Sequence, residues 1–386
     1  MHMSGELAGA DFIVVGAGAV GSSISYRLAQ SGAQVTIVES NYPAGGTSGN
    51  SVAWLNGFNK HPRDYYRLNV NSIRDHRELE DELGGNWLTQ GGGLHWSDGT
   101  GAGYTSDLEG TVKRLRAWGA RIESHTPMDI MSHIEPDLCL DPDVVETVYI
   151  VRDEGWVQAA VMVQALIERA SRGYGAKLVY GTVCDLQGKS GEVDTVVLES
   201  GERLSADVVI VAGGAQAGRL AAMAGSSIPI EQNAGVLAVT APAPVGIKRV
   251  IVGPGIILRP DGGGRLLMAS DPLLSVPAET VPSQEMPEMG ELLERARCLV
   301  PSLHGVPIEA FRMGIRPVPR DGYPIVGFDP NVHGLYYAVT HSGITLSACL
   351  GNLVADDLIT ATSDVLDAYR PERFFNAKVS QGPTGE

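Results

Sequence analysis

Cysteine is scarce in this chain of 386 residues. The four that occur are Cys139, Cys184, Cys298 and Cys349, and no two of them have the close spacing of a metal-binding or redox motif. A framework of disulfides is therefore not expected, and no metal site is predicted.

The sequence also lacks a long apolar run. No stretch reaches the roughly eighteen consecutive apolar residues that suggest a membrane-spanning helix. Residues 1–10 lack the basic start and apolar core of a secretory signal, and they are expected to form a short flexible lead. The simplest expectation is a cytoplasmic protein without a membrane span.

Basic residues are fewer than acidic residues in this chain. Lysine and arginine number 29 against 45 aspartates and glutamates, so the formal net charge is -16. This balance argues against nucleic acid or an anionic membrane surface as a partner, because both need a basic surface on the protein. An anionic substrate would need a local cationic anchor. The hydrophobic content of 44% and the 48 glycines suit a globular α/β protein with many tight turns.

A glycine motif occupies the turn between a predicted strand and a predicted helix near the start of the chain. Gly16, Gly18 and Gly21 follow the apolar run 12–15, and Glu39 ends the next apolar run. In such a turn Gly16 permits the tight bend, Gly18 lets the backbone approach a pyrophosphate, and Gly21 lets the helix pack closely on the strand. Phosphates would lie at the helix N-terminus, and Glu39 would bind a ribose diol. The unit predicts a dinucleotide site without distinguishing FAD from NAD; a turn that binds nothing is the alternative.

The order of the predicted elements indicates a nucleotide-binding domain that is interrupted twice. Strand-like runs between 228 and 268 are punctuated by proline and glycine, which is typical of a separate antiparallel sheet. Helices are predicted over residues 65–83, 108–118, 157–172, 291–299 and 344–360. The segments 10–75, 146–225 and 311–370 are assigned to the nucleotide-binding domain, and 76–145 and 226–310 to a substrate domain.

A second pattern lies near the end of the chain. Arg316-Pro317 is followed by Asp321-Gly322-Tyr323-Pro324-Ile325-Val326-Gly327, and then by Tyr336-Tyr337-Ala338-Val339-Thr340-His341-Ser342-Gly343. In these segments the chain resembles the FAD-dependent amine oxidoreductases that include D-amino-acid oxidase, glycine oxidase and sarcosine oxidase. The resemblance runs from about residue 10 to residue 369. It implies an α/β fold in which a Rossmann-like FAD-binding domain carries a second domain built on a mainly antiparallel sheet.

The resemblance also implies roles for two residues of this second pattern. Arg316 stands where the family places the arginine that pairs with the substrate carboxylate, and a planar guanidinium suits that task. The alternative is a structural arginine paired with a nearby acid, a role for which Arg312 and Arg320 are also candidates, while Arg259 is expected to be structural. His341 is a second catalytic candidate, although a structural role in the His-Ser-Gly turn is more common.

Several segments are expected to hold the cofactor. The last predicted helix would point its N-terminal amides at the flavin, with Ser342 or Thr345 as its cap. By resemblance, the loop 45–54 passes the pyrophosphate and the flavin ring, and Val183 contacts the adenine. The predicted cofactor-binding residues are Gly16, Gly18, Ala19, Val20, Gly21, Glu39, Ser40, Gly46, Thr47, Ser48, Ser51, Val52, Ala53, Val183, Ala212, Gly213, Gly343, Ile344 and Thr345.

The chain departs from its relatives at three places. The segment 313–316 holds no cysteine and the segment 50–52 holds no histidine, so FAD should be bound noncovalently. Ile256 and Ile257 occupy a strand where glycine oxidase has a substrate-contacting tyrosine. An apolar wall there favours an amine that is bulkier or more hydrophobic than glycine.

Other titratable residues follow the cofactor loop. Lys60 and His61 are expected in a solvated, charged turn. Lys60 or Lys248 could assist oxygen reduction if either lay near the flavin, but the sequence locates neither.

These observations predict an enzyme that oxidises the C–N bond of an amino acid or secondary amine carrying a carboxylate. A hydride would pass from the α carbon to flavin N5, and the imine formed would be hydrolysed. Oxygen or another acceptor would take the electrons, and an oligomer is possible. The alternatives are an NAD-dependent dehydrogenase and a noncatalytic flavin-binding protein; the amine and its stereochemistry stay open.

Overall fold

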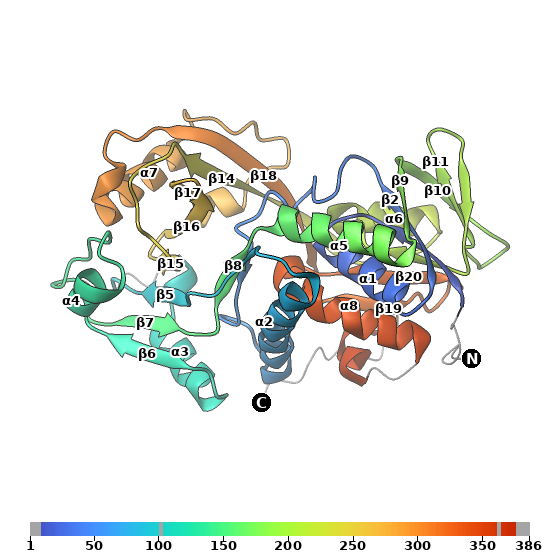
Figure 1. Ribbon diagram of the computed structural model, residues 1–386, viewed down its shortest axis with the longest axis horizontal. Coiled ribbons are helices and arrows are strands. Elements are labelled where there is room, and N and C mark those ends of the chain that lie inside the picture. The colour runs from blue at the N-terminus through green and yellow to red at the C-terminus, as the bar shows by residue number, and fades with distance from the viewer. Residues whose placement is uncertain (1–8, 100–102, 361–363, 376–386) are drawn as a thin grey trace.

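The chain folds around two large sheets that lie in separate lobes (Figure 1). The structure is a computed structural model, and it describes residues 9–99, 103–360 and 364–375. The six-stranded sheet lies on the right of the view, beside helices α1, α5 and α8, and the eight-stranded sheet lies on the left.

The six-stranded sheet is parallel except at one edge. Its order is β19-β20-β13-β1-β2-β9, and only β19 runs antiparallel to its neighbour. The parallel strands end at one edge, where open α/β sheets bind their ligands. The strands are β1 (Asp11–Val15), β2 (Gln34–Glu39), β9 (Lys177–Tyr180), β13 (Val208–Val211), β19 (Ile325–Phe328) and β20 (Leu335–Val339).

Four helices pack beside this sheet. Helix α1 (Ala19–Gln30) packs against α8 (Gly343–Ile359) and α5 (Ala159–Tyr174), and α2 (Arg63–Leu83) packs against α8. Ile24, Leu28, Leu346 and Leu350 are fully buried between them. Burial of these apolar stripes fixes the start of α1 and of α8 beside the sheet edge.

The eight-stranded sheet has the order β18-β14-β17-β16-β15-β5-β7-β6, and only the β15–β5 pair is parallel. Successive side chains of each strand point to opposite faces of the sheet, so both faces present apolar side chains for packing. Helix α7 (Pro287–Leu299) packs on one face and α3 (Leu108–Ala117) on the other. The strands are β5 (Gly93–Trp96), β6 (Ile122–His125), β7 (Val148–Val151), β14 (Ile230–Thr240), β15 (Val250–Gly253), β16 (Ile256–Gly262), β17 (Arg265–Ala269) and β18 (Ile308–Pro319).

Two small sheets complete the strand structure, with orders β10-β11-β12 and β3-β8-β4. The short helices are α4 (Pro127–Asp129), α6 (Ala217–Met223) and α9 (Glu372–Phe375). The small-sheet strands are β3 (Trp54–Leu55), β4 (Leu88–Thr89), β8 (Gly155–Val157), β10 (Val183–Gln187), β11 (Thr195–Leu198) and β12 (Arg203–Ser205).

The α/β fold with a mainly antiparallel second sheet is confirmed. Strands β7 and β18 differ from the expected division, because β7 pairs with β5 and β6, and β18 pairs with β14. The predicted boundaries at 146 and 311 had assigned β7, and β18 from residue 311 onward, to the nucleotide-binding domain, whereas both strands lie in the eight-stranded sheet. No single helix in the described part of the chain is long and apolar enough to cross a membrane, and one bent pair, α8 with residues 364–375, meets the test by length and composition only.

Candidate cofactor and substrate site

A cavity of about 780 Å³ runs along the carboxyl edge of the six-stranded sheet. Most of the residues predicted to bind cofactor or substrate line it, although they come from segments far apart in the sequence. The predicted residues Gly21, Val52, Ala53 and Thr345 are not part of the lining. Those that line it are Gly16, Gly18, Ala19, Val20, Glu39, Ser40, Gly46, Thr47, Ser48, Ser51, Val183, Ala212, Gly213, Gly343 and Ile344, together with Arg316 and His341.

The glycine turn at one end of the cavity has no room for side chains. Gly16 has φ +110°, and a Cβ on it would lie 2.6 Å from the Ala212 carbonyl oxygen. A Cβ on Gly21 would lie 2.0 Å from the Gly16 carbonyl oxygen, so Gly21 lets α1 pack against the turn rather than facing the cavity. The backbone of the turn therefore borders the cavity directly, as the approach of a pyrophosphate requires.

The start of α1 offers amides to this end of the cavity. The helix has no acidic residue in its first turn, and the amide of Ala19 donates to Ser48 Oγ over 3.0 Å. Free amides and the positive helix end favour an anion here. Because the glycines of the turn carry no side chains and the first turn of α1 holds no acidic residue, the site fits a phosphate group.

Glu39 lies at the end of β2 with its carboxylate held by the backbone. One oxygen accepts from the Ala17 amide over 2.9 Å, and the other accepts from the Asn41 amide over 2.9 Å. Each carboxylate oxygen has a further lone pair, so the fixed carboxylate can accept ribose hydroxyls. The acid at this position thus fits the ribose of a dinucleotide.

Helix α8 begins at the other end of the cavity, and its expected cap is absent. Ser342 precedes the helix, but its hydroxyl contacts Lys60 Nζ at 2.9 Å and the Tyr65 hydroxyl at 3.0 Å and makes no cap hydrogen bond. Thr345 Oγ1 instead donates to the Trp54 carbonyl over 3.2 Å. The prediction that Ser342 or Thr345 caps α8 is wrong, because groups from the β3–α2 segment occupy both hydroxyls.

The expectation of a solvated turn is wrong for Lys60. Its side chain is half-buried against Ser342, and burial lowers the pKa of Lys60 to about 8. His61 is exposed, as expected. Lys248 lies elsewhere, beside β15 of the eight-stranded sheet, where its amide donates to Glu135 over 3.2 Å.

Arg316 projects from β18 and carries unused hydrogen-bonding capacity. Its Nη2 donates to Asn233 Oδ1 over 3.0 Å and to the Leu274 carbonyl, while the buried Nε has no partner. Burial lowers the pKa of Arg316, and no carboxylate pairs with it within the described residues. An anion that entered the cavity would supply the missing partner.

The neighbouring arginines are satisfied structurally. Arg312 and Arg259 both pair with Asp261, at 3.1 Å and 3.2 Å. Arg259 is only 3% exposed, and its guanidinium lies 4.6 Å from the centre of the Trp156 ring. Arg312 and Arg259 thus each pair with a carboxylate, whereas Arg316 pairs with none in the described part of the chain.

His341 faces the cavity as a neutral group. The side chain is exposed at the cavity, where the surrounding protein partly desolvates it and lowers its pKa to about 4; the positive charges of Lys60 and Arg316 act in the same direction. A neutral imidazole can donate or accept a hydrogen bond at pH 7 but adds no charge.

Sequence reasoning missed a close contact between β18 and the cofactor loop. A Cβ on Gly314 would lie 2.7 Å from the Asn50 carbonyl oxygen, and Thr47 Oγ1 donates to the Ile315 carbonyl. The glycine within a strand pattern was the available signal. Other lining residues that were missed are Val15, Val38, Asn41, Gly45, Gly181, Thr182, Gly214, Ala215, Gln216, Arg219, Leu220, Met313, Gly314, Ile315, Pro317, Ala338, Val339 and Thr340.

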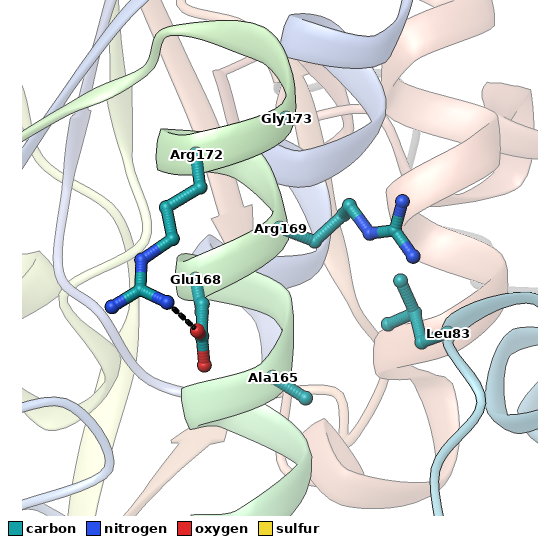
Figure 2. A pocket seen from close by; sticks show the side chains of 6 residues that line it. All are labelled: Leu83, Ala165, Glu168, Arg169, Arg172 and Gly173. Carbon is teal, nitrogen blue, oxygen red and sulfur yellow. Dashed lines mark hydrogen bonds and ion pairs between the residues drawn. The ribbon is translucent and has the colours of Figure 1, made fainter.

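A second, shallower hollow of about 400 Å³ lies between the end of α2 and α5 (Figure 2). Its polar groups are the exposed pair Glu168–Arg172 at 2.5 Å and the exposed Arg169. An exposed ion pair between residues four apart on a helix is an ordinary surface feature. The hollow shows no convergence of groups comparable to the sheet-edge cavity.

Comparison with known proteins agrees with this geometry. The family described as FAD dependent oxidoreductase matches residues 11–357. Glycine oxidase of Geobacillus kaustophilus is 28% identical over 356 residues, covering 90% of this chain and 92% of that enzyme. The crystal structure of that glycine oxidase has a TM-score of 0.82 at 26% identity and covers 94% of this chain and 98% of its own. A subunit of the opine oxidase of Agrobacterium tumefaciens is 24% identical over 385 residues, covering 94% and 97% of the two chains.

Proposed function

Because the chain belongs to the family of FAD-dependent oxidoreductases, we propose that it oxidises the C–N bond of an amine or amino acid that carries a carboxylate. The similarity to glycine oxidase and to the opine oxidase subunit supports an amine as the substrate class. The proposed product is an imine, which water hydrolyses. The family match confirms FAD as the cofactor, and we propose that it is bound noncovalently.

The observation that carries this proposal is the state of Arg316. It lines the cavity, has a buried Nε without a partner, and is paired with no acid in the described part of the chain. A half-buried guanidinium that lacks an anion is costly, and a substrate carboxylate would remove that cost through charge-assisted hydrogen bonds. Asn233 and the Leu274 carbonyl hold the guanidinium in place for this task.

The residues that would hold FAD follow from the cavity lining. The α1 amides and Ser48 would bind the pyrophosphate, and Glu39 would bind the adenosine ribose. The bound flavin supplies a two-electron acceptor for hydride. The protein's contribution is then to place the substrate and to exclude water.

The charges around the cavity also act on the substrate amine. Hydride transfer needs the neutral amine, whose lone pair assists departure of the hydride. Arg316 and Lys60 are cationic, and nearby positive charge lowers the pKa of an ammonium group. We infer that this environment favours loss of the amine proton without a dedicated protein base, since His341 is a poor proton acceptor at a pKa of about 4.

The alternative of an NAD-dependent dehydrogenase is less well supported. It accounts for the turn from Gly16 to Gly21 and for Glu39, but it explains neither Arg316 nor the position of α8. The family match points to FAD.

The test is anaerobic mixing of the purified yellow protein with matched pairs of amines that differ only in a carboxylate. Bleaching of the flavin by carboxylated amines, with little or none by their carboxylate-free partners, would support the proposal. Preference for carboxylate-free amines, or no bleaching by any amine, would contradict it. Admitting air then shows whether oxygen is the electron acceptor, because rapid return of the yellow colour with formation of peroxide identifies an oxidase.

A further inference from the structure

Acidic side chains are almost absent from the wall of the sheet-edge cavity. Among the lining residues that the structure describes, Glu39 is the only aspartate or glutamate, and the Ala17 and Asn41 amides already hold its carboxylate. No acid accompanies Arg316 and His341, which also line the cavity. Because the whole chain has a formal net charge of -16, this part of the wall is an exception that favours an anionic ligand.

His341 lies close to two cations. Desolvation is the main reason for its low pKa, and the positive charges of Lys60 and Arg316 lower that pKa further. Both charges must lie near the imidazole to have this effect, because Coulomb interactions weaken with distance. Lys60 also donates from Nζ over 2.9 Å to Ser342, the residue that follows His341. We refer to Lys60, Arg316 and His341 as the basic cluster.

Each member of the basic cluster has N–H groups without a partner in the described part of the chain. The buried Nε of Arg316 is unpaired, and only Nη2 donates. The ammonium group of Lys60 has three donors, of which Ser342 accepts one. A neutral imidazole carries one N–H, and the ring of His341 makes no hydrogen bond to a described residue.

A single carboxylate would not satisfy the basic cluster. A carboxylate that pairs bidentately with Arg316 uses both of its oxygens, so Lys60 and His341 would remain without an anion. Although burial lowers the pKa of Lys60 to about 8, most of its ammonium is charged at pH 7. Glu154 favours that charge from a distance, but its Oε2 already contacts His95 Nε2 at 2.9 Å. A half-buried ammonium without a paired anion is costly, and the protein itself provides no such anion.

We propose that the substrate amine carries two carboxylates, one bound by Arg316 and the other bound by His341 and Lys60. The inference rests on the proposed function and narrows its substrate class. His341 lines the cavity, so its N–H would donate to the second carboxylate directly. Lys60 is not part of the lining, and its ammonium would reach past Ser342, which its flexible four-carbon chain permits.

The first test measures binding without oxidation. Thiodiacetate and (methylthio)acetate differ only in the second carboxylate, and both carry sulfur in place of an oxidisable amine. Titration of the FAD-loaded protein at pH 7, followed by the absorption of the flavin, gives their dissociation constants. We expect thiodiacetate to bind at least tenfold more tightly, because its second carboxylate gains charge-assisted hydrogen bonds. Thiodipropionate and (methylthio)propionate repeat the comparison at a longer spacing.

Three variants then test the role of the lysine, after their FAD content has been measured. Lys60→Met should narrow the preference for the dicarboxylate to less than threefold, whereas Lys60→Arg should retain it. Tyr65→Phe is the matched control, because it removes the other hydrogen bond to Ser342 without changing the charge, and it should also retain the preference. If Lys60→Met does not hold FAD, Lys60→Gln replaces it.

Two binding results would overturn the inference. One is binding of the two members of a pair within threefold of each other at both spacings. The other is an equal loss of affinity for both members in Lys60→Met, which would mean that the lysine does not contact the second carboxylate.

A comparison of amines separates this inference from the proposed function. Iminodiacetate and N-methylglycine also differ only in a second carboxylate, and we expect iminodiacetate to reduce the flavin at least tenfold more efficiently. Equal reduction by both amines would overturn the inference while the proposed function stands. If no amine reduces the flavin, the proposed function fails, whereas the sulfur analogues still decide whether the site binds two carboxylates.

Discussion

The glycine at the base of the dinucleotide turn makes a sharp prediction about cofactor affinity. In Gly21→Ala the new Cβ would lie 2.0 Å from the Gly16 carbonyl oxygen, and real Cβ atoms essentially never come within 3.0 Å of such an atom. The start of α1 must therefore move away from the turn by about an ångström. The amides that would bind the pyrophosphate move with it.

The expected effect can be worked out from the hydrogen bonds at risk. A hydrogen bond to a charged group contributes about 1.5–3 kcal/mol. Loss of one amide–phosphate bond should weaken FAD binding by roughly tenfold to a hundredfold. Fluorescence titration of the apoprotein with FAD measures this change.

A matched control is Gly218→Ala. Gly218 lies in α6, and a Cβ there would meet nothing closer than 4.0 Å. Helix propensity alone should make this variant slightly more stable. The reasoning is refuted if Gly21→Ala binds FAD within threefold of wild type, or if both variants weaken binding equally.

Two further predictions concern Glu39 and the packing of α8. Glu39→Ala should raise the dissociation constant of FAD by about tenfold or more, because the hydrogen bonds to the adenosine ribose are lost. The dissociation constant of FMN, which lacks that ribose, should stay within twofold of the wild-type value. Equal losses of affinity for both ligands would contradict the assignment of Glu39 to the ribose. Burial lowers the pKa of His76 to about 4, and its Nε2 contacts the Ile344 carbonyl at 2.9 Å, so the unfolded chain binds an extra proton between about pH 6.5 and pH 4. The contribution of His76 should therefore lower the free energy of unfolding by up to about 3 kcal/mol as the pH drops from 7 to 4. Urea unfolding of His76→Gln should show a smaller fall over the same range, while His341 contributes in the same direction in both proteins. Identical pH profiles for the two proteins would refute the role of His76.

Local patterns allowed much of the site to be predicted. The spacing of Gly16, Gly18 and Gly21 reflects the backbone of one turn, and the structure has that turn at the cavity. The start of α8 was predicted within one residue because the strand, turn and helix are contiguous in the sequence.

The environment of Lys60 could not be read from local patterns. Lys60 and Ser342 are 282 residues apart, and a charged residue beside proline and arginine is typical of a solvated turn. The packing of β3 and α2 on α8 brings them together. That β7 and β18 belong to the eight-stranded sheet was missed for the same reason, since both strands gain their partners through long-range pairing.

The central claim is that Arg316 binds a substrate carboxylate. The most direct test is a double-mutant cycle that measures the rate of flavin reduction for the wild type and Arg316→Met with an amino acid and its decarboxylated amine. We predict a loss of about tenfold to a hundredfold for the amino acid, less than threefold for the amine, and no change in the exposed control Arg320→Met. Equal losses for both substrates, or no loss for the amino acid, would contradict the account.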